Sequence, residues 1–116
     1  VAEYCRIRFA DEPREAVAAL LLDSKHRVET FDLLHEGTGA RSAAFPHELA
    51  ACALADRATG IVLAHHQPSG VPEPSLDDLA VTRELKQALR AIGVQLLDHL
   101  VVGRAGYYSF QEAGLL

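Results

Sequence analysis

The sequence lacks long apolar runs, methionine and tryptophan, and it has only two cysteines. No apolar run approaches the roughly 20 residues of a membrane-spanning helix, and the first residues lack the basic, apolar and small-residue order of a signal peptide. Cys5 and Cys52 are too few for a disulfide framework and are not spaced as a metal knuckle, which favours two reduced thiols. We therefore expect a cytoplasmic protein with no membrane segment.

Basic residues are also scarce. The chain has 11 Lys and Arg against 16 Asp and Glu, a formal net charge of -5, and no basic block. Tight binding to a phosphate backbone depends on many basic contacts that release counterions, so this composition disfavours direct nucleic-acid binding. Methionine is missing at position 1 as well, and we expect the chain to be part of a longer protein.

The composition that is present suits one compact domain. The 116 residues are 49% hydrophobic, which is enough to bury a single core, and we expect one domain over residues 1–116. Apolar periodicity and turn signals predict the elements in this order: strands at 16–22 and 28–34, a helix from 46 that ends before 60, a strand at 61–64, a helix at 75–92, and strands at 94–102 and 107–110. This order indicates an α/β fold in which a mixed β-sheet is flanked by helices.

The stretch from His65 to Asp78 combines imidazoles, Gly/Pro turns and a carboxylate at a helix start. On an extended strand end, the side chains at 65 and 67 point the same way, whereas the side chain at 66 faces the opposite side. An aspartate in the first turn of the next helix could complete a set of three ligands. Three protein ligands and a water form a catalytic zinc site, in which the metal lowers the pKa of the water to about 7. The spacing therefore predicts a metal site at the end of a buried strand.

The same stretch resembles the His-Asn-His-Pro-Ser-Gly, Pro-Ser and Asp signature of the RadC group of JAB/MPN domains. Glu36-Gly37-Thr38 is similar to the Glu-Gly-Thr loop of that family, Pro46-His47-Glu48 to its Pro-Arg-Glu helix start, and Leu97-Asp98-His99 to its Leu-Asp-His strand. The resemblance covers most of the chain, from about Leu20 onward. It implies the JAB/MPN fold, which is cytidine-deaminase-like, and the chemistry of a zinc metalloprotease.

The resemblance also implies roles for individual residues. His65, Asp78 and the residue at position 67 would hold Zn²⁺, Glu36 would activate the water, and Ser75 would stabilise the oxyanion. Position 67 departs from the pattern, because Gln67 stands where the family has its second histidine. A neutral amide oxygen is a weaker zinc ligand than an imidazole nitrogen, so we expect a degenerate, weakly metallated site.

His66 is the alternative ligand to Gln67. Its imidazole is adjacent in sequence, but a shift of one residue sends a side chain to the opposite face of a strand. His66 could reach the metal only if the strand end were twisted or bulged. A zinc site completed by His66 is therefore the alternative hypothesis.

Several of these residues also have a purely structural explanation. Ser75 and Asp78 form a Ser-x-x-Asp pattern, which starts a helix as a capping box and contributes about 1 kcal/mol. Glu36 by itself would be a solvated acid. Asp98 and His99 are best interpreted as a hydrogen-bonded structural pair, with support of a metal ligand as the alternative. The remaining histidines are expected at the surface: His26, His35 and His47.

The function predicted from the resemblance is hydrolysis of an amide or isopeptide bond by a zinc metalloprotease-type domain. The substrate or partner would be a protein or peptide. The alternative is a non-catalytic MPN-type protein-interaction module, and Gln67 is its main support. The association of the family name with DNA repair has no physical support in this acidic chain.

Overall fold

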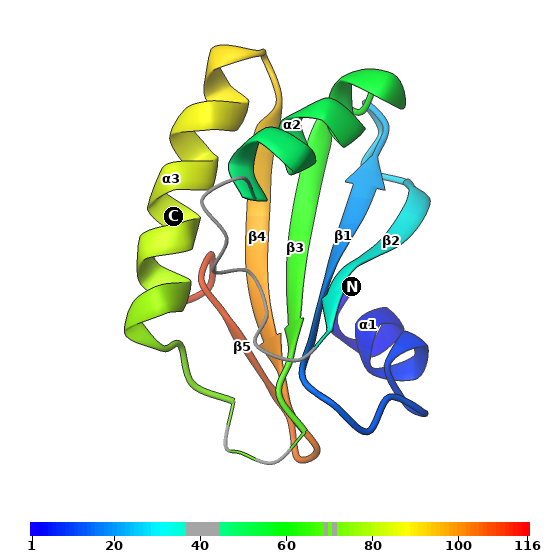
Figure 1. Cartoon of the computed structure of the whole chain (residues 1–116), viewed down its shortest axis with the longest axis vertical. Coiled ribbons are helices and arrows are strands. Elements are labelled where there is room, and N and C mark those ends of the chain that lie inside the picture. The colour runs from blue at the N-terminus through cyan, green and yellow to red at the C-terminus, as the bar shows by residue number, and fades with distance from the viewer. Residues whose placement is uncertain (37–44, 69, 71) are drawn as a thin grey trace.

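The computed structural model describes residues 1–36, 45–68, 70 and 72–116, with the backbone alone at 35, 36 and 45. Within these residues the chain forms one sheet and three helices (Figure 1). The elements are α1 Ala2–Arg8, β1 Ala16–Leu22, β2 Val28–Glu36, α2 Phe45–Ala55, β3 Gly60–His66, α3 Leu76–Ala91, β4 Gln95–Val102 and β5 Tyr107–Ser109.

The five strands lie in the order β2-β1-β3-β4-β5. β3 and β4 run parallel, and the other three neighbouring pairs are antiparallel. The sheet is therefore mixed, with helices against both of its faces, which confirms the α/β fold class predicted from the sequence. The parallel pair is joined through α3, so the C-terminal end of β3 lies close to the start of α3 (Figure 1).

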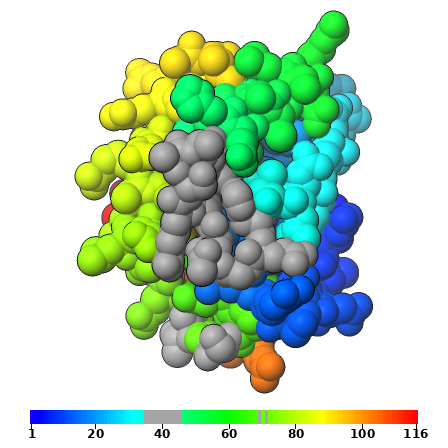
Figure 2. Space-filling model, in the orientation of Figure 1, coloured from blue at the N-terminus to red at the C-terminus, as the bar shows by residue number. Residues whose placement is uncertain are grey.

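The central strands β1 and β3 are buried along their whole length, because both faces of the sheet are covered. One face packs against α2 and α3, and Figure 2 shows this side, with α3 on the left, α2 at the top and β2 on the right. The other face packs against α1 and Phe9. Alternate residues of β1 divide between the two cores, with Val17 in the first and Ala18 in the second.

The structure corrects two boundaries and adds one helix. The predicted strand end at Ala64 is wrong, because β3 continues through His65 and His66, both of which are buried. The loop predicted from His35 starts later, since β2 continues to Glu36; the rest of that loop, 37–44, lies outside the described residues. The sequence did not predict α1, because a seven-residue helix with Cys5 as its one buried residue shows no repeated apolar face.

No helix within the described part of the chain is long and apolar enough to cross a membrane.

Candidate metal centre

His65 and His66 end strand β3 and point to opposite faces of the sheet. β1 and β3 pair without a register shift from Gly60 to His66, so the alternation of side chains is kept to the end of the strand. His65 faces α3, where it contacts Asp78. His66 stacks on Phe9, with ring centroids 4.7 Å apart, and its Nε2 donates to the backbone oxygen of Glu12 at 2.9 Å. No bulge turns His66 toward the first face, as the strand pattern predicts.

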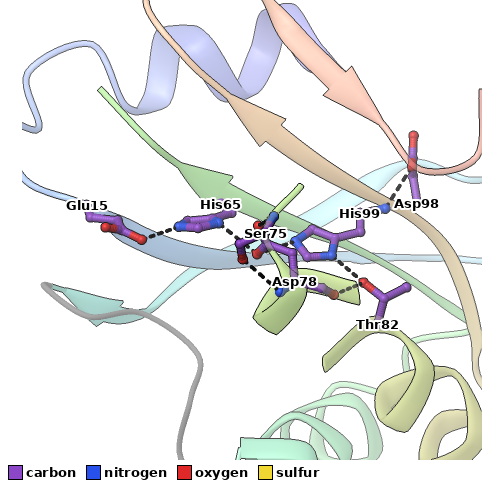
Figure 3. A network of polar contacts seen from close by, with 7 residues as sticks. All are labelled: Glu15, His65, Ser75, Asp78, Thr82, Asp98 and His99. Carbon is purple, nitrogen blue, oxygen red and sulfur yellow. Dashed lines mark hydrogen bonds and ion pairs between the residues drawn. The ribbon is translucent and has the colours of Figure 1, made fainter. Parts of the chain in front are cut away.

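Asp78 is placed by the first turn of α3. Ser75 is the N-cap, and its Oγ accepts from Asp78 N at 3.0 Å, while Asp78 Oδ2 accepts from Ser75 N at 2.9 Å. This capping box uses one carboxylate oxygen and fixes the direction of the other. Asp78 Oδ1 lies 2.9 Å from Nδ1 of His65 and 3.8 Å from Nε2 of His99. Capping and a role at the site therefore coexist in one residue (Figure 3).

His99 is the third member of the site, and it comes from the middle of β4. In the parallel pairing of β3 and β4 it lies opposite Leu63, two residues before His65, and so on the same face of the sheet. The imidazole is 1% exposed and stacks on Phe110, with centroids 4.6 Å apart. Figure 3 shows the rings of His65 and His99 on either side of Asp78.

Hydrogen bonding sets the tautomer of His99. Thr82 Oγ1 lies 2.7 Å from the backbone oxygen of Asp78 and 2.5 Å from Nδ1 of His99. A carbonyl oxygen only accepts, so the Thr82 hydroxyl donates to it and accepts from Nδ1–H of His99. Nε2 of His99 is then unprotonated. It is buried and has no hydrogen-bond partner among the described residues, and it faces a carboxylate oxygen.

The three side chains fit a metal ion. One ligand atom from each of His65, Asp78 and His99 can be chosen so that all three lie within 4.8 Å of one another. Nitrogen and oxygen ligands at about 2.0 to 2.1 Å from a tetrahedral zinc lie roughly 3.3 Å apart. The separations of 2.9 Å and 3.8 Å around Asp78 Oδ1 bracket that value. Two imidazoles and a carboxylate are also a donor set that zinc accepts, and a cation between Nε2 of His99 and Asp78 would offset the contact of two electron-rich atoms.

The charges of the site depend on its burial and its hydrogen bonds. Burial by itself would raise the pKa of Asp78, but the hydrogen bonds from His65 and from the backbone of Ser75 lower it to about 2. Burial would likewise lower the pKa of His65, but hydrogen bonds and charges of Asp78 and Glu15 outweigh it, so the pKa is raised. Burial lowers the pKa of His99 to about 4, which keeps the ring neutral at pH 7.

Gln67 and Glu36, which the sequence analysis assigned to the site, are not among these three side chains. Gln67 donates its backbone N–H to Val102 O at 2.8 Å, and its Oε1 is buried without a hydrogen-bond partner among the described residues. The backbone of Glu36 pairs with Ala16, but its side chain lies outside the described residues, so its role as the base stays a prediction. Ser75 lies directly beside Asp78, as its spacing predicts.

Sequence reasoning missed three residues of the site. The sequence alone favours a structural pairing of His99 with Asp98, and Asp98 Oδ1 does accept from His99 N at 2.7 Å. The signal available was an imidazole in the middle of an apolar strand. Glu15 contacts His65 at 2.6 Å, and Thr82 contacts His99; neither has a local sequence signal, because both contacts join segments far apart in the chain.

Comparison with known proteins gives the same relationship as the sequence motifs. The model of the family described as the RadC-like JAB domain matches residues 1–115. The chain is 44% identical over 116 residues to a UPF0758 protein of Methylibium petroleiphilum, which covers all of this chain and 52% of that protein. It is 46% identical over 112 residues to a UPF0758 protein of Shewanella amazonensis, covering 97% of this chain and 50% of that protein. The chain thus spans about half the length of these curated relatives.

Proposed function

Because the chain belongs to the RadC-like JAB domain family, we propose that it is a zinc-dependent hydrolase domain in which His65, Asp78 and His99 hold the metal. The observation that carries the proposal is the buried Nε2 of His99, which has no hydrogen-bond partner among the described residues and faces Asp78 Oδ1 at 3.8 Å. A hydrogen-bond donor or a cation can complete that contact, and the histidine and carboxylate around it favour the cation. In this proposal His99 is the third metal ligand, the role that the family pattern gives to the residue at position 67.

The proposed reaction is hydrolysis of an amide or isopeptide bond in a protein or peptide. Zinc in a site with three protein ligands supplies a Lewis acid and lowers the pKa of water to about 7. Ser75 Oγ accepts from Asp78 N, so its own hydroxyl hydrogen remains able to donate to a substrate oxygen, in line with the oxyanion role that the resemblance implies. By the resemblance, Glu36 would be the base that accepts the proton of the water. A protein or peptide partner also suits the net charge of -5 better than a nucleic acid does.

Metal content tests the proposal directly. The protein would be purified without chelator and its zinc measured by mass spectrometry, for the wild type and for His65→Ala, His99→Ala and His66→Ala. We expect stoichiometric zinc in the wild type, loss of zinc in the first two variants, and retention in His66→Ala, whose side chain lies on the other face of the sheet. The exposed His47→Ala serves as a surface control. A wild type without zinc, or a His99→Ala variant that keeps it, would contradict the proposal.

Activity requires a second measurement, because zinc can be bound without turnover. We expect the zinc-loaded protein to cleave peptide or isopeptide substrates in a chelator-sensitive way, and we expect the Asp78→Asn variant to lose both zinc and cleavage. The measurement is product formation by mass spectrometry on a mixture of peptides and ubiquitin-like isopeptide conjugates. Bound zinc without cleavage of any of them would reduce the proposal to a metal-binding domain.

The second candidate is a non-catalytic protein-interaction module of the same fold. Its support is Gln67 together with the contacts of His65, whose two ring nitrogens lie 2.6 Å and 2.9 Å from the carboxylates of Glu15 and Asp78. A protonated imidazole satisfies both carboxylates without a metal. This candidate predicts the absence of stoichiometric zinc and unchanged partner binding after treatment with chelator.

A further inference from the structure

A cleft of about 530 Å³ lies on the face of the sheet opposite the candidate metal centre. One wall is formed by α1 and the segment 9–13 that follows it, and the other by the end of β4 and the turn at 103–104. Figure 1 shows both walls at the lower end of the sheet. The volume of the cleft falls within the range of about 300 to 1,000 Å³ that is usual for small-ligand sites.

The buried residues of the lining form the floor of the cleft, and they include His66. In the signature that this stretch resembles, asparagine stands at this position, whereas this chain has a histidine that is 8% exposed. A carbonyl oxygen only accepts, so Nε2 of His66 carries the hydrogen that is donated to Glu12 O. In the neutral ring Nδ1 is then an acceptor, and it has no hydrogen-bond partner among the described residues. A ligand with an N–H or O–H group at the floor would satisfy this nitrogen.

Charged groups of both signs line the cleft. Arg104 and Asp11 are exposed, and neither side chain has a hydrogen bond or ion pair with another described residue. The guanidinium of Arg6 lies 3.4 Å from Glu3 Oε2 and 3.5 Å from Arg104 O. An exposed ion pair of this kind contributes little and can exchange for another partner. The cleft therefore offers guanidinium groups to a carboxylate, and in Asp11 and Glu12 it offers carboxylates to an ammonium group.

We propose that this cleft binds a short zwitterionic peptide of two or three residues. The carboxylate of the peptide contacts Arg104 and Arg6, and its ammonium group contacts Asp11. An apolar side chain of the peptide lies against Phe9, which is 2% exposed and stacks on His66. A peptide N–H supplies the donor for Nδ1 of His66, and a free amino acid has no such group besides its ammonium.

The lining favours this class of ligand over a simple anion. Three acidic side chains, those of Glu3, Asp11 and Glu12, line the cleft together with the arginines and would repel a ligand that carries negative charge alone. The site is also separate from the candidate metal centre, because His65 and His66 point to opposite faces of the sheet. The inference therefore does not depend on zinc.

Titration with the dipeptide glycyl-leucine tests the proposal. The chain would be titrated in the presence of chelator and followed by ¹H–¹⁵N correlation spectroscopy. At an ordinary ligand efficiency a molecule of this size binds with a dissociation constant of about 1 mM. We expect shifts of the amide signals of Ala10 and Gly103, which line the cleft, and none at Leu85 and Leu89, which pack on the other face of the sheet. Glycyl-leucine amide lacks the carboxylate and acetyl-glycyl-leucine lacks the ammonium group, so each should bind about 10-fold more weakly.

Variants of the lining test the same contacts from the protein side. Arg104→Gln and Asp11→Asn, both at exposed positions, should each weaken binding of glycyl-leucine about 10-fold. His66→Asn introduces the residue of the family signature and should also weaken binding. Arg83→Gln and Glu84→Gln are the matched controls, because both residues are exposed on α3, and they should bind as the wild type does. Circular dichroism of each variant checks that the fold is kept.

Several results would overturn the proposal. They are the absence of saturable shifts up to about 20 mM glycyl-leucine, shifts confined to α3, or equal binding of glycyl-leucine and either of its two blocked forms. Wild-type affinity in Arg104→Gln or in Asp11→Asn would overturn it as well. Because the titration is done in chelator, none of these results bears on the proposed zinc site.

Discussion

Acid should destabilise this protein between about pH 6.5 and 4, because His99 is buried in its neutral form. Burial is the main cause that lowers the pKa of His99, to about 4 from its ordinary value of 6.5. The charge of Asp78 acts in the opposite direction, and the charge of His65 adds to the lowering. In this window the unfolded chain binds a proton at residue 99 that the folded chain does not bind, so the free energy of unfolding falls as the pH falls.

The size of the effect follows from the two pKa values. One pKa unit corresponds to about 1.4 kcal/mol, so a pKa that falls from 6.5 to about 4 corresponds to about 3 kcal/mol. His65 opposes this change, because its raised pKa contributes stability that is present below its ordinary value and lost as the pH rises through the raised value. Asp78, with a pKa of about 2, loses its contribution only below about pH 4.

The assay therefore compares the wild type with a variant in which residue 99 does not titrate. Urea unfolding would be followed by circular dichroism from pH 7 to pH 4 in the presence of chelator, for the wild type and His99→Leu. Leucine leaves the Thr82 hydroxyl bonded to the backbone oxygen of Asp78. We expect the stability of the wild type relative to the variant to fall by about 3 kcal/mol across this range. His47→Leu, at an exposed position, should show no such trend.

One result would refute the reasoning. If the difference in unfolding free energy between wild type and His99→Leu stays constant from pH 7 to pH 4, then His99 titrates alike in the folded and unfolded states. The ring would then not be held neutral by burial, and the assignment of an unprotonated Nε2 facing Asp78 would lose its support.

Three further predictions concern the site and the core. Gln67→His restores the family residue and should tighten zinc binding in chelator competition, since imidazole is the better ligand; unchanged affinity would mean that residue 67 does not reach the metal. Ser75→Ala removes the acceptor for Asp78 N and should lower the unfolding free energy by about 1 kcal/mol, whereas Ser75→Thr should keep most of it. Leu63→Ala, at a 1% exposed core position, should cost about 2 to 5 kcal/mol in urea unfolding, while Leu33→Ala, at 46% exposure, should change stability by less than about 0.5 kcal/mol.

Much of the fold could be predicted because its central elements have strong local signals. β1 is an uninterrupted apolar segment, and α3 begins at a capping box and keeps an apolar repeat to Ile92. The end of β3 was placed two residues early because His65 and His66 are polar, and only their burial by other elements keeps them in the strand. α1 was missed because its packing depends on Cys5 and on Phe9, which follows the helix, rather than on a periodic face.

The site could be predicted only where local geometry determines it. The alternation of a strand gives opposite directions to His65 and His66, and the capping pattern gives the position of Asp78; both predictions need only neighbouring residues. The place of His99 depends on the pairing of β4 with β3, in which it lies opposite Leu63. The contact of Glu15 with His65 joins residues fifty positions apart. Register between strands is not encoded in a short motif, so both residues required the fold.

Gln67 has two explanations: the metal site is degenerate, or His99 serves as the third ligand in place of residue 67. A buried nitrogen without a hydrogen-bond partner costs roughly 1 to 3 kcal/mol, and Nε2 of His99 is such an atom among the described residues. In a degenerate site no metal is bound, and the cost either remains or is offset by a bound water. The effect of His99→Leu on stability would then be the same with chelator and without it. If His99 is the third ligand, the metal offsets the cost. Added zinc should then raise the unfolding free energy of the wild type and leave that of His99→Leu unchanged. The stabilisation of each protein by added zinc therefore separates the two cases, whatever residue 67 contributes.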